Sequence, residues 1–368
     1  MADMVRVAVI GRTGRGDYGH GLDTVWADVP GTTVVAVADD DREGLAKAAK
    51  RLGVDRAYAD YRQMLDEVKP DIVTIATRWA DQHRDMTVAA AERGVHIFME
   101  KPYCRTPAEA DEIVAACERT HTRLAIAHQT HYSPKIDVVR RLIAEGKIGR
   151  VLEFRGRGKE DQRGGGEDLF VLGSHIMDLI RVFGGEPQWC CGTVLTDGRP
   201  VGRDDVWEGP EGLGPLAGDS IRAMFGMPEG QTAYFNSHRN AGNGARFALV
   251  ICGSLGMIEI QTGSLPSVKY LEDATWSPGR SGAAWQDVSS AGVGVREPLT
   301  DSSAHAGNKA AALDLIAAIR ENRDTKCSAY DARATIEMIM AVFDSHRLGG
   351  PVKFPLANRQ NPLAMLPA

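Results

Sequence analysis

Short apolar segments alternate with helical patterns over the first third of the chain. Strand patterns are expected at 5–11, 33–38, 72–77, 95–99 and 124–127, with helical patterns at 42–52, 61–67, 81–93 and 107–120. Strands joined in this way run parallel, because a right-handed crossover helix carries the chain back to the end of the sheet where the previous strand began. The sequence therefore predicts a doubly wound parallel α/β sheet over residues 1–127.

A glycine-rich loop follows the first predicted strand. It reads Gly11-Arg12-Thr13-Gly14-Arg15-Gly16, and we expect a helix from there through Val25. A strand, a glycine loop and a helix in this order are the context of a dinucleotide-binding fingerprint. Gly11 allows the tight turn and Gly16 allows close packing, but Thr13 stands where backbone must approach pyrophosphate. Either Gly14 supplies that freedom or Thr13 hydrogen-bonds a phosphate.

Asp39-Asp40-Asp41 ends the second predicted strand. A carboxylate at this place accepts two hydrogen bonds from an adenosine ribose diol and repels a 2′-phosphate. Asp39 therefore predicts NAD in preference to NADP, although Arg42 directly after it could reverse that preference. One member of the aspartate run is also expected to cap the helix at 42–52.

Glu100-Lys101-Pro102 follows the apolar strand at 96–99. Proline cannot donate to a sheet ladder, so it belongs at the end of a strand. Ligands of open α/β sheets bind outside the carboxyl ends of the strands, and partial burial of Lys101 there would lower its pKa towards the range useful for proton transfer. The alternative is a helix-start turn carrying a solvated ion pair.

The pattern changes after residue 129. Helices are expected at 134–145, 170–183, 306–321 and 331–347, and strands at 151–157, 188–195, 220–225, 232–236, 247–252, 256–262 and 268–271. Turn signals between these strands favour a mostly antiparallel open sheet. The segments 196–218 and 275–301 are rich in Gly, Pro and Ser and are expected to be loops. Residues 128–368 are thus predicted to form an α+β domain for substrate binding and oligomerisation.

Taken together, these motifs resemble the glucose–fructose oxidoreductase and inositol dehydrogenase (Gfo/Idh/MocA) family over nearly the whole chain. The matching features are the glycine loop, Asp39, Thr77, His83, Glu100-Lys101-Pro102, Gly164-Gly165-Gly166 and Gly173-Ser174-His175-Ile176-Met177-Asp178. The resemblance implies Lys101 and His175 as catalytic residues and Glu100 as a contact of the nicotinamide ribose. The implied cofactor contacts are Gly11, Arg12, Thr13, Gly14, Gly16, Asp39, Thr77, Arg78, Trp79, His83, Glu100 and Lys101.

This implied pair suits the oxidation of a secondary alcohol. Histidine titrates near the working pH and can take the hydroxyl proton, while a lysine ammonium stabilises a developing alkoxide. The family commonly has an aspartate four residues before this histidine, where the chain has Val171, and Glu167, Asp168 or Asp178 could substitute for it.

The segment 158–168 is strongly polar and predicts a strongly polar substrate. The residues expected to bind it are Lys159, Arg163, Asp168, Asp178 and His238, although Asp178 could instead face the core or an interface.

The resemblance implies an NAD-dependent oxidoreductase acting on a secondary hydroxyl of a sugar, glycoside or cyclitol. One alternative is an enzyme that keeps NAD bound and oxidises a sugar transiently, so that the net reaction is glycoside cleavage or elimination. A second alternative is a non-catalytic, NAD-responsive binding protein, because a fold does not dictate a function.

Composition sets the remaining expectations. The 368 residues exceed one ordinary core, and a net charge of −6 argues against a nucleic-acid partner. The six cysteines are scattered without a C-x-x-C spacing, which predicts free thiols and no metal site. The N-terminal residues run directly into a strand, and no apolar run is long enough for a bilayer, so we expect a cytoplasmic protein with no membrane partner. The family resemblance implies a homodimer or homotetramer.

Overall fold

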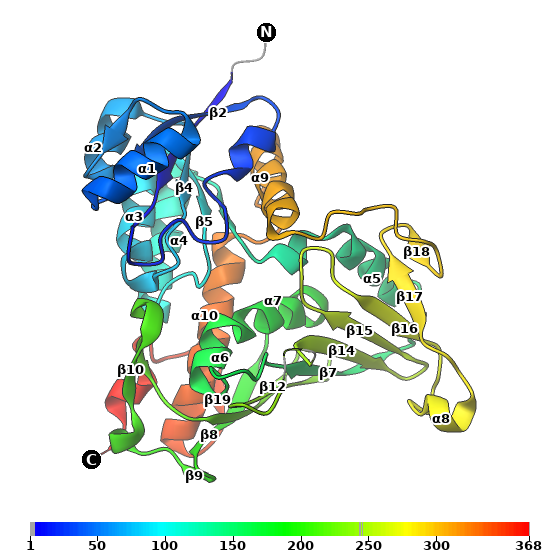
Figure 1. Cartoon of the computed structure of the whole chain (residues 1–368). Coiled ribbons are helices and arrows are strands. Elements are labelled where there is room, and N and C mark those ends of the chain that lie inside the picture. The colour runs from blue at the N-terminus through cyan, green and yellow to red at the C-terminus, as the bar shows by residue number, and fades with distance from the viewer. Residues whose placement is uncertain (1–3, 243, 245, 368) are drawn as a thin grey trace. The chain divides into compact units, whose positions relative to one another are not determined.

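The computed structural model describes residues 4–242, 244 and 246–367, which form two compact units (Figure 1). The first unit combines 4–129 with 210–214 and 304–336, and the second holds the other described residues from 130 onwards. The segment 304–336, which the sequence pattern assigned to the C-terminal domain, therefore packs in the first unit. Each unit is described separately.

The first unit is built on a six-stranded parallel sheet in the order β3-β2-β1-β4-β5-β6. Its strands are β1 (Val5–Ile10), β2 (Thr32–Ala38), β3 (Ala57–Tyr58), β4 (Ile72–Ile75), β5 (His96–Met99) and β6 (Leu124–Ile126). The strand order reverses direction between β1 and β4, so the predicted doubly wound sheet is confirmed. Most residues of β1 and all of β4 are buried, as expected for strands covered on both faces.

Helices in the first unit connect these strands. They are α1 (Arg42–Leu52), α2 (Tyr61–Val68), α3 (His83–Ala91) and α4 (Pro107–Thr120). The unit also contains the later helix α9 (Ala304–Glu321) and the first part of α10 (Ala329–Leu348). Asp41 caps α1, because its carboxylate accepts a hydrogen bond of 2.7 Å from the Gly44 amide. This confirms that one member of the aspartate run is a helix cap.

The prediction of a helix directly after the glycine loop is wrong. Residues 13–24 form turns, and only the short 3-10 helix η1 (Val25–Asp28) follows. Four glycines at 14, 16, 19 and 21 take positive φ angles in this stretch, a conformation that an α-helix cannot contain. The segment still buries Val25 and Trp26, and α9 packs on η1 and on β6.

The second unit contains a mixed sheet with a single parallel contact, between β7 and β13, among the strand pairs described. The strand order is β18-β17-β16-β15-β14-β7-β13-β12-β8-β19, with β9 paired to β8. The bounds are β7 (Val151–Arg157), β8 (Trp189–Thr196), β9 (Arg199–Pro200), β12 (Ser220–Gly226), β13 (Thr232–His238), β14 (Ala248–Gly253), β15 (Met257–Gln261), β16 (Val268–Leu271), β17 (Gln286–Ser289), β18 (Gly292–Val293) and β19 (Val352–Lys353). The predicted, mostly antiparallel sheet is confirmed.

Helices of the second unit differ from the prediction at one place. They are α5 (Pro134–Ala144), α6 (Gly166–Val171), α7 (Gly173–Gly184) and α8 (Pro278–Ser281). The single helix expected at 170–183 is instead two helices that meet at Leu172. The segments expected to be loops also carry short strands, namely β9, β10 (Trp207–Gly209), β11 (Gly214–Leu216), β17 and β18.

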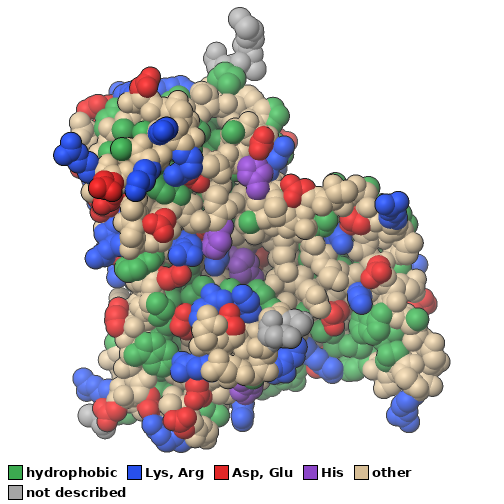
Figure 2. All heavy atoms as spheres, in the orientation of Figure 1, with side chains coloured by type: hydrophobic (Ala, Val, Ile, Leu, Met, Phe, Trp, Pro, Cys, Tyr) green, Lys and Arg blue, Asp and Glu red, His purple; other side chains and the backbone are tan. Residues whose placement is uncertain are grey.

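Surface properties add one finding. On the face drawn in Figure 2, basic and acidic side chains lie interspersed. Among the residues that the structure describes, no helix combines the length and the apolar character needed to cross a bilayer.

The packing of Trp26 leads to a stability prediction. Its ring meets Phe98 edge-on at 5.9 Å, and its indole N–H donates to the buried Thr74 hydroxyl at 2.7 Å. We expect Trp26→Ala to lower the free energy of unfolding by about 3–5 kcal/mol, because it leaves a cavity and removes the partner of a buried hydroxyl. Urea denaturation followed by circular dichroism measures this loss. Leu313→Ala, at an exposed position of α9, is the control, with an expected change of about 0.5 kcal/mol.

Candidate functional site

A cavity of about 330 Å³ opens at the carboxyl ends of the first unit's strands. It is lined by residues that end β1 and β2 and by the first turns of α2 and α3, among them Gly11, Arg12, Asp39, Asp40, Tyr61 and Met86. This is the end of a doubly wound sheet where nucleotides bind. Five of the sequence-predicted cofactor residues lie in the loop that runs along it, at Gly11, Arg12, Thr13, Gly14 and Gly16.

The glycine loop is a closed turn. Arg12 and Asp17 exchange backbone hydrogen bonds of 3.0 and 2.9 Å, and the Gly14 amide donates to the Asp17 carboxylate at 2.9 Å. Gly16 lies against the segment after β4, since a Cβ on it would come within 2.5 Å of the Arg78 amide. Gly16 thus allows a close approach to this segment, and not to a helix as the sequence suggested.

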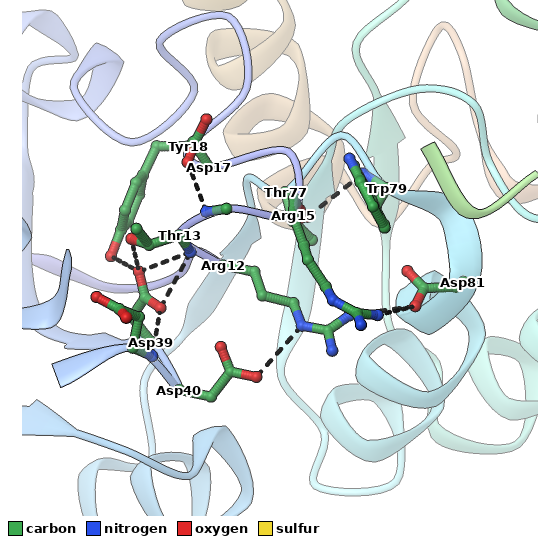
Figure 3. A network of polar contacts seen from close by, with 12 residues as sticks. Arg12, Thr13, Arg15, Asp17, Tyr18, Asp39, Asp40, Thr77, Trp79 and Asp81 are labelled. Carbon is green, nitrogen blue, oxygen red and sulfur yellow. Dashed lines mark hydrogen bonds and ion pairs between the residues drawn. The ribbon is translucent and has the colours of Figure 1, made fainter. Parts of the chain in front are cut away.

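Asp39 is the anchor of this loop (Figure 3). Its carboxylate accepts the Thr13 amide, the Thr13 hydroxyl at 2.7 Å and the Tyr18 hydroxyl at 2.8 Å, and it is 2% exposed. Thr13 was predicted to contact a phosphate and Asp39 to contact the ribose. In this structure the two side chains are instead hydrogen-bonded to each other.

Tyr18 was not predicted from the sequence. Its ring covers Gly11, and the Arg51 guanidinium lies 4.5 Å from the ring centre. Burial, and next the Asp39 charge, raise the pKa of the Tyr18 phenol well above its ordinary value, so this hydroxyl stays a donor.

The segment after β4 holds four predicted cofactor residues. The Thr77 hydroxyl donates to the Arg15 carbonyl at 2.6 Å, and the Trp79 ring stacks near Arg15. His83 is fully buried and its two ring nitrogens contact the carbonyl oxygens of Thr77 and Pro102 at 2.8 and 2.7 Å. His83 therefore ties the end of β4 to the turn after β5, while the Arg78 amide donates to the Gly16 carbonyl.

Glu100 and Lys101 lie at the carboxyl end of β5, as predicted. Glu100 is 1% exposed and accepts the His20 amide at 2.8 Å, the His20 ring at 2.7 Å and the Lys101 amide at 3.1 Å. Burial raises the pKa of Glu100, but the His20 hydrogen bonds and charge outweigh burial and hold that pKa below its usual value. A buried, charged carboxylate thus lies next to Lys101.

His20 is the second residue that sequence reasoning missed. Its side chain is 44% exposed although one ring nitrogen faces Glu100, and its carbonyl accepts the Asn308 amide at 3.0 Å. Gly19 makes this possible, because a Cβ there would come within 2.5 Å of both Glu100 and the Ala76 carbonyl. The run of glycines at 14, 16, 19 and 21 was the available signal, since it argues against a helix.

In the second unit, His175 lies in the first turn of α7. The side chain is partly exposed, and its ring meets the Phe247 ring edge-on at 6.2 Å. Val171, at the position of the family's aspartate, is buried at the end of α6.

Asp168 does not face a substrate site as predicted, because it is fully buried. Its carboxylate accepts the amides of Lys159 and Glu160 and the Ser237 hydroxyl, the last at 2.5 Å. Burial raises the pKa of Asp168, and these donors oppose that shift. Asp168 therefore fixes the turn that begins the segment 158–168, called the polar loop below.

Lys159 and Arg163 remain on the accessible side of this loop. Both lie beside Asp161, Arg163 at 2.5 Å and Lys159 at 3.6 Å. The Arg163 hydrogen bond lowers the pKa of Asp161 to about 2. His238 contacts the Ser220 hydroxyl at 2.8 Å and is partly exposed.

Asp178 is also buried, at 1% exposure, and pairs with His131 at 3.0 Å. The Arg140 guanidinium lies 3.4 Å from the other ring nitrogen of His131. The structure therefore places Asp178 in the core of the second unit, which was the alternative that the sequence left open.

Two family models match the chain. Residues 5–128 match the model described as "Oxidoreductase family, NAD-binding Rossmann fold", and residues 136–259 match the "GFO/IDH/MocA C-terminal domain". Together the two matches span most of the chain.

Similar proteins include D-apiose dehydrogenase of Paraburkholderia graminis, which is 33% identical over 190 residues. That alignment covers 49% of this chain and 50% of the relative, so the chain spans about half the length of this curated relative. Glycosyl hydrolase family 109 protein 1 of Akkermansia muciniphila is 28% identical over 181 residues, 45% of this chain and 37% of the relative. The solved levoglucosan dehydrogenase, in complex with NADH and levoglucosan, is 23% identical with a TM-score of 0.77, covering 95% of this chain and 99% of that one. At this identity the likeness shows the fold alone.

The buried Glu100 leads to a pH-dependent prediction. Because its folded pKa lies below the ordinary value of 4.5, its stabilisation is present above about pH 4.5 and is lost as the pH falls. We expect His20→Ala to lower the free energy of unfolding by about 1.5–3 kcal/mol at pH 7, and by progressively less as the pH falls below 4.5 through the folded pKa of Glu100, where the carboxyl takes up a proton. Urea denaturation at pH 7 and at a series of pH values below 4.5 measures the difference.

His305→Ala is the matched control for this variant. His305 also contacts a carboxylate at 2.7 Å in the first unit, but that carboxylate, Asp28, is 61% exposed. Its loss should cost less than about 1 kcal/mol. Equal losses for the two histidines at pH 7 would contradict the role given to Glu100.

The anchoring role of Asp168 gives a second prediction. We expect Asp168→Ala to lower stability by about 2–4 kcal/mol and to speed amide hydrogen exchange at 158–165, because two amides and a hydroxyl lose a buried acceptor. Hydrogen exchange with mass spectrometry measures the local effect. Asp137→Ala, which removes a half-exposed helix ion pair, should leave that exchange unchanged. Unchanged exchange in Asp168→Ala itself would show that the carboxylate does not hold the loop.

Proposed function

The chain belongs to the GFO/IDH/MocA oxidoreductase family, and from that premise we propose that it uses NAD to oxidise a secondary hydroxyl of a sugar, glycoside or cyclitol. One observation carries the proposal. Glu100 and Lys101 end β5 in an NAD-binding Rossmann sheet, on the edge where the glycine loop lies. In this proposal residues 1–127 bind the cofactor and residues 128–368 bind the substrate, in a homodimer or homotetramer.

Lys101 and His175 are the proposed proton relay. NAD, when bound, supplies the acceptor for the hydride that leaves the carbinol carbon. The His175 imidazole takes the hydroxyl proton, and the Lys101 ammonium stabilises the negative charge that develops on the oxygen. Lys101 has the setting for this role, because its amide is fixed on the buried, charged Glu100 beside it.

NAD is favoured over NADP by the acidic residues at the end of β2. Asp39 is buried and held by Thr13 and Tyr18, while Asp40 is 60% exposed beside Arg12. Two carboxylates at this place repel a 2′-phosphate.

The proposed substrate contacts are reduced to Lys159, Arg163 and His238. These three side chains are polar and partly accessible, and they belong to the polar loop or to the strand β13. Hydrogen-bonding groups of this kind suit a polyol. The names of the relatives, D-apiose dehydrogenase and levoglucosan dehydrogenase, support a sugar or an anhydrosugar as the substrate class.

A second candidate is a redox cycle with bound NAD that ends in glycoside cleavage. Two observations favour it. Val171 replaces the acid of the family's proton relay, and one relative is named a family 109 glycosyl hydrolase. A third candidate, an NAD-responsive protein without catalysis, is disfavoured by the presence of both Lys101 and His175.

Catalysis provides the direct test. In a panel of pentoses, anhydrosugars and cyclitols, we expect NAD-dependent formation of NADH, with kcat reduced about 10²- to 10⁴-fold in Lys101→Ala and His175→Ala. The controls are His305→Ala, at a partly exposed residue, and Lys47→Ala, at an exposed one. No NADH from any member, in protein that binds NAD, would reject the dehydrogenase.

The two catalytic candidates separate in a further assay. The redox cycle predicts release of nitrophenol from a nitrophenyl glycoside without net NADH, and NAD that survives gel filtration of the purified protein. An ordinary dehydrogenase predicts protein that is purified empty and binds NAD reversibly.

A further inference from the structure

Two arginines of the glycine loop converge on one carboxylate (Figure 3). The Arg12 guanidinium lies 3.2 Å from Asp81 and 3.3 Å from Asp40, and the Arg15 guanidinium lies 3.6 Å from the same Asp81 oxygen. Asp81 belongs to the 3-10 turn η2 (Ala80–Gln82), just after the Thr77–Trp79 segment. Two cations from one loop thus share a single anion.

Three successive backbone amides of this loop are already in use. The Thr13 amide donates to Asp39, the Gly14 amide to the Asp17 carboxylate and the Arg15 amide to the Arg12 carbonyl. A glycine loop that cradles phosphate does so with amides that point at the ligand. Here one of three successive amides donates to Asp39 at the end of β2, and the other two donate to other parts of the loop.

In a dinucleotide-binding fold, a helix usually follows the glycine loop, and the partial positive charge of its N-terminus faces the phosphates. In the part of this chain that the structure describes, no such helix lies directly after the loop. Turns and the 3-10 helix η1 replace it among residues 13–28, which the structure describes in full. The field of aligned peptide dipoles at a helix N-terminus is a major source of phosphate binding in dinucleotide folds. Positive charge for a diphosphate must come from side chains of the loop.

Asp81 is a weakly held partner for these arginines. Only one of its oxygens contacts them, and its other oxygen, Oδ1, is buried with no hydrogen-bond partner among the described residues. The Arg12 side chain is 11% exposed and lines the cavity at the strand ends, while Arg15 is 53% exposed. A diphosphate offers several charged oxygens, and arginine binds such groups with paired hydrogen bonds.

We propose that Arg12 and Arg15 bind the pyrophosphate of the dinucleotide, and that Asp81 is an internal counter-ion which the arginines leave when the ligand binds. The proposal rests on the proposed NAD-dependent function and specifies how its cofactor is held. It makes Asp81 a competitor of the ligand, so removal of its charge strengthens binding. It also makes binding sensitive to salt, because the attraction is between charged side chains and phosphate.

The test uses ADP and NAD as probes of the full-length protein in titration calorimetry, at low and high salt. The variants are Arg12→Gln, Arg15→Gln and Asp81→Asn. Lys47→Gln removes the same charge from the exposed face of α1 and is the control. Thermal unfolding of each variant reports whether it is folded, and Arg15→Gln changes a largely exposed side chain that folding does not need.

We expect Arg12→Gln to weaken ADP binding about tenfold or more, Arg15→Gln to weaken it about threefold, and both to reduce the salt dependence. Asp81→Asn should tighten ADP and NAD binding about threefold, and Lys47→Gln should change neither. The opposite signs of the arginine and aspartate variants distinguish competition from general damage to the loop.

Several results would overturn the proposal. These are unchanged ADP affinity in both arginine variants, weaker binding in Asp81→Asn, or no binding of either nucleotide to the wild-type protein. Each readout is an affinity and needs no turnover. If the variants bind nucleotide as expected here but the protein shows no dehydrogenase activity, this inference stands and the proposed reaction is rejected. If the protein is an active dehydrogenase but the variants do not bind nucleotide as expected, only this inference is rejected.

Discussion

The buried carboxylate of Glu100 is the interaction on which the first unit's functional edge depends. It accepts hydrogen bonds from the amide and ring of His20 and from the Lys101 amide, so it joins the loop after β1 to the end of β5. A charged group with 1% exposure is tolerated only when donors surround it. One of those donors is the amide of Lys101, the proposed catalytic lysine. The same hydrogen bond therefore stabilises the buried Glu100 charge and fixes the backbone of Lys101.

The parallel sheet and most helix bounds of the first unit followed from the sequence, because hydrophobic periodicity and end signals are local. Helix α4, for example, begins at Pro107 after Thr106, whose hydroxyl accepts the Glu109 amide, and it spans the predicted residues. The two-residue edge strand β3 was missed, since it is too short to carry such a pattern. The stretch after the glycine loop could not be predicted in this way. Its turns are fixed by hydrogen bonds to the carboxylates of Asp39 and Glu100, which lie far away in the sequence. Such long-range contacts cannot be predicted from the periodicity of apolar residues.

The polar loop of the second unit shows the same limit for site residues. Lys159, Arg163 and Asp168 look alike to sequence reasoning, as charged residues in a glycine-rich segment. Ser237 separates them, because it brings a hydroxyl from β13 onto the Asp168 carboxylate and buries it. Asp178 was equally ambiguous until His131 supplied its partner. Whether an acid meets a substrate or a buried donor is decided by long-range packing, whereas the position of Lys101 at the end of a strand could be predicted from the local sequence alone.

Helix α9 covers the part of the first unit where the expected helix after β1 is absent, through its contacts with η1 and β6. That cover is made by residues 304–321, near the far end of the chain. During synthesis a ribosome completes the sheet strands long before it reaches this helix, although domains commonly fold as they emerge. The apolar residues under α9 stay open to water or to chaperones until residues 304–321 have been made. Nascent chains of this protein thus complete their nucleotide-binding fold only after most of the second unit's sheet has been synthesised, because α9 follows all but the last strand of that sheet in the sequence.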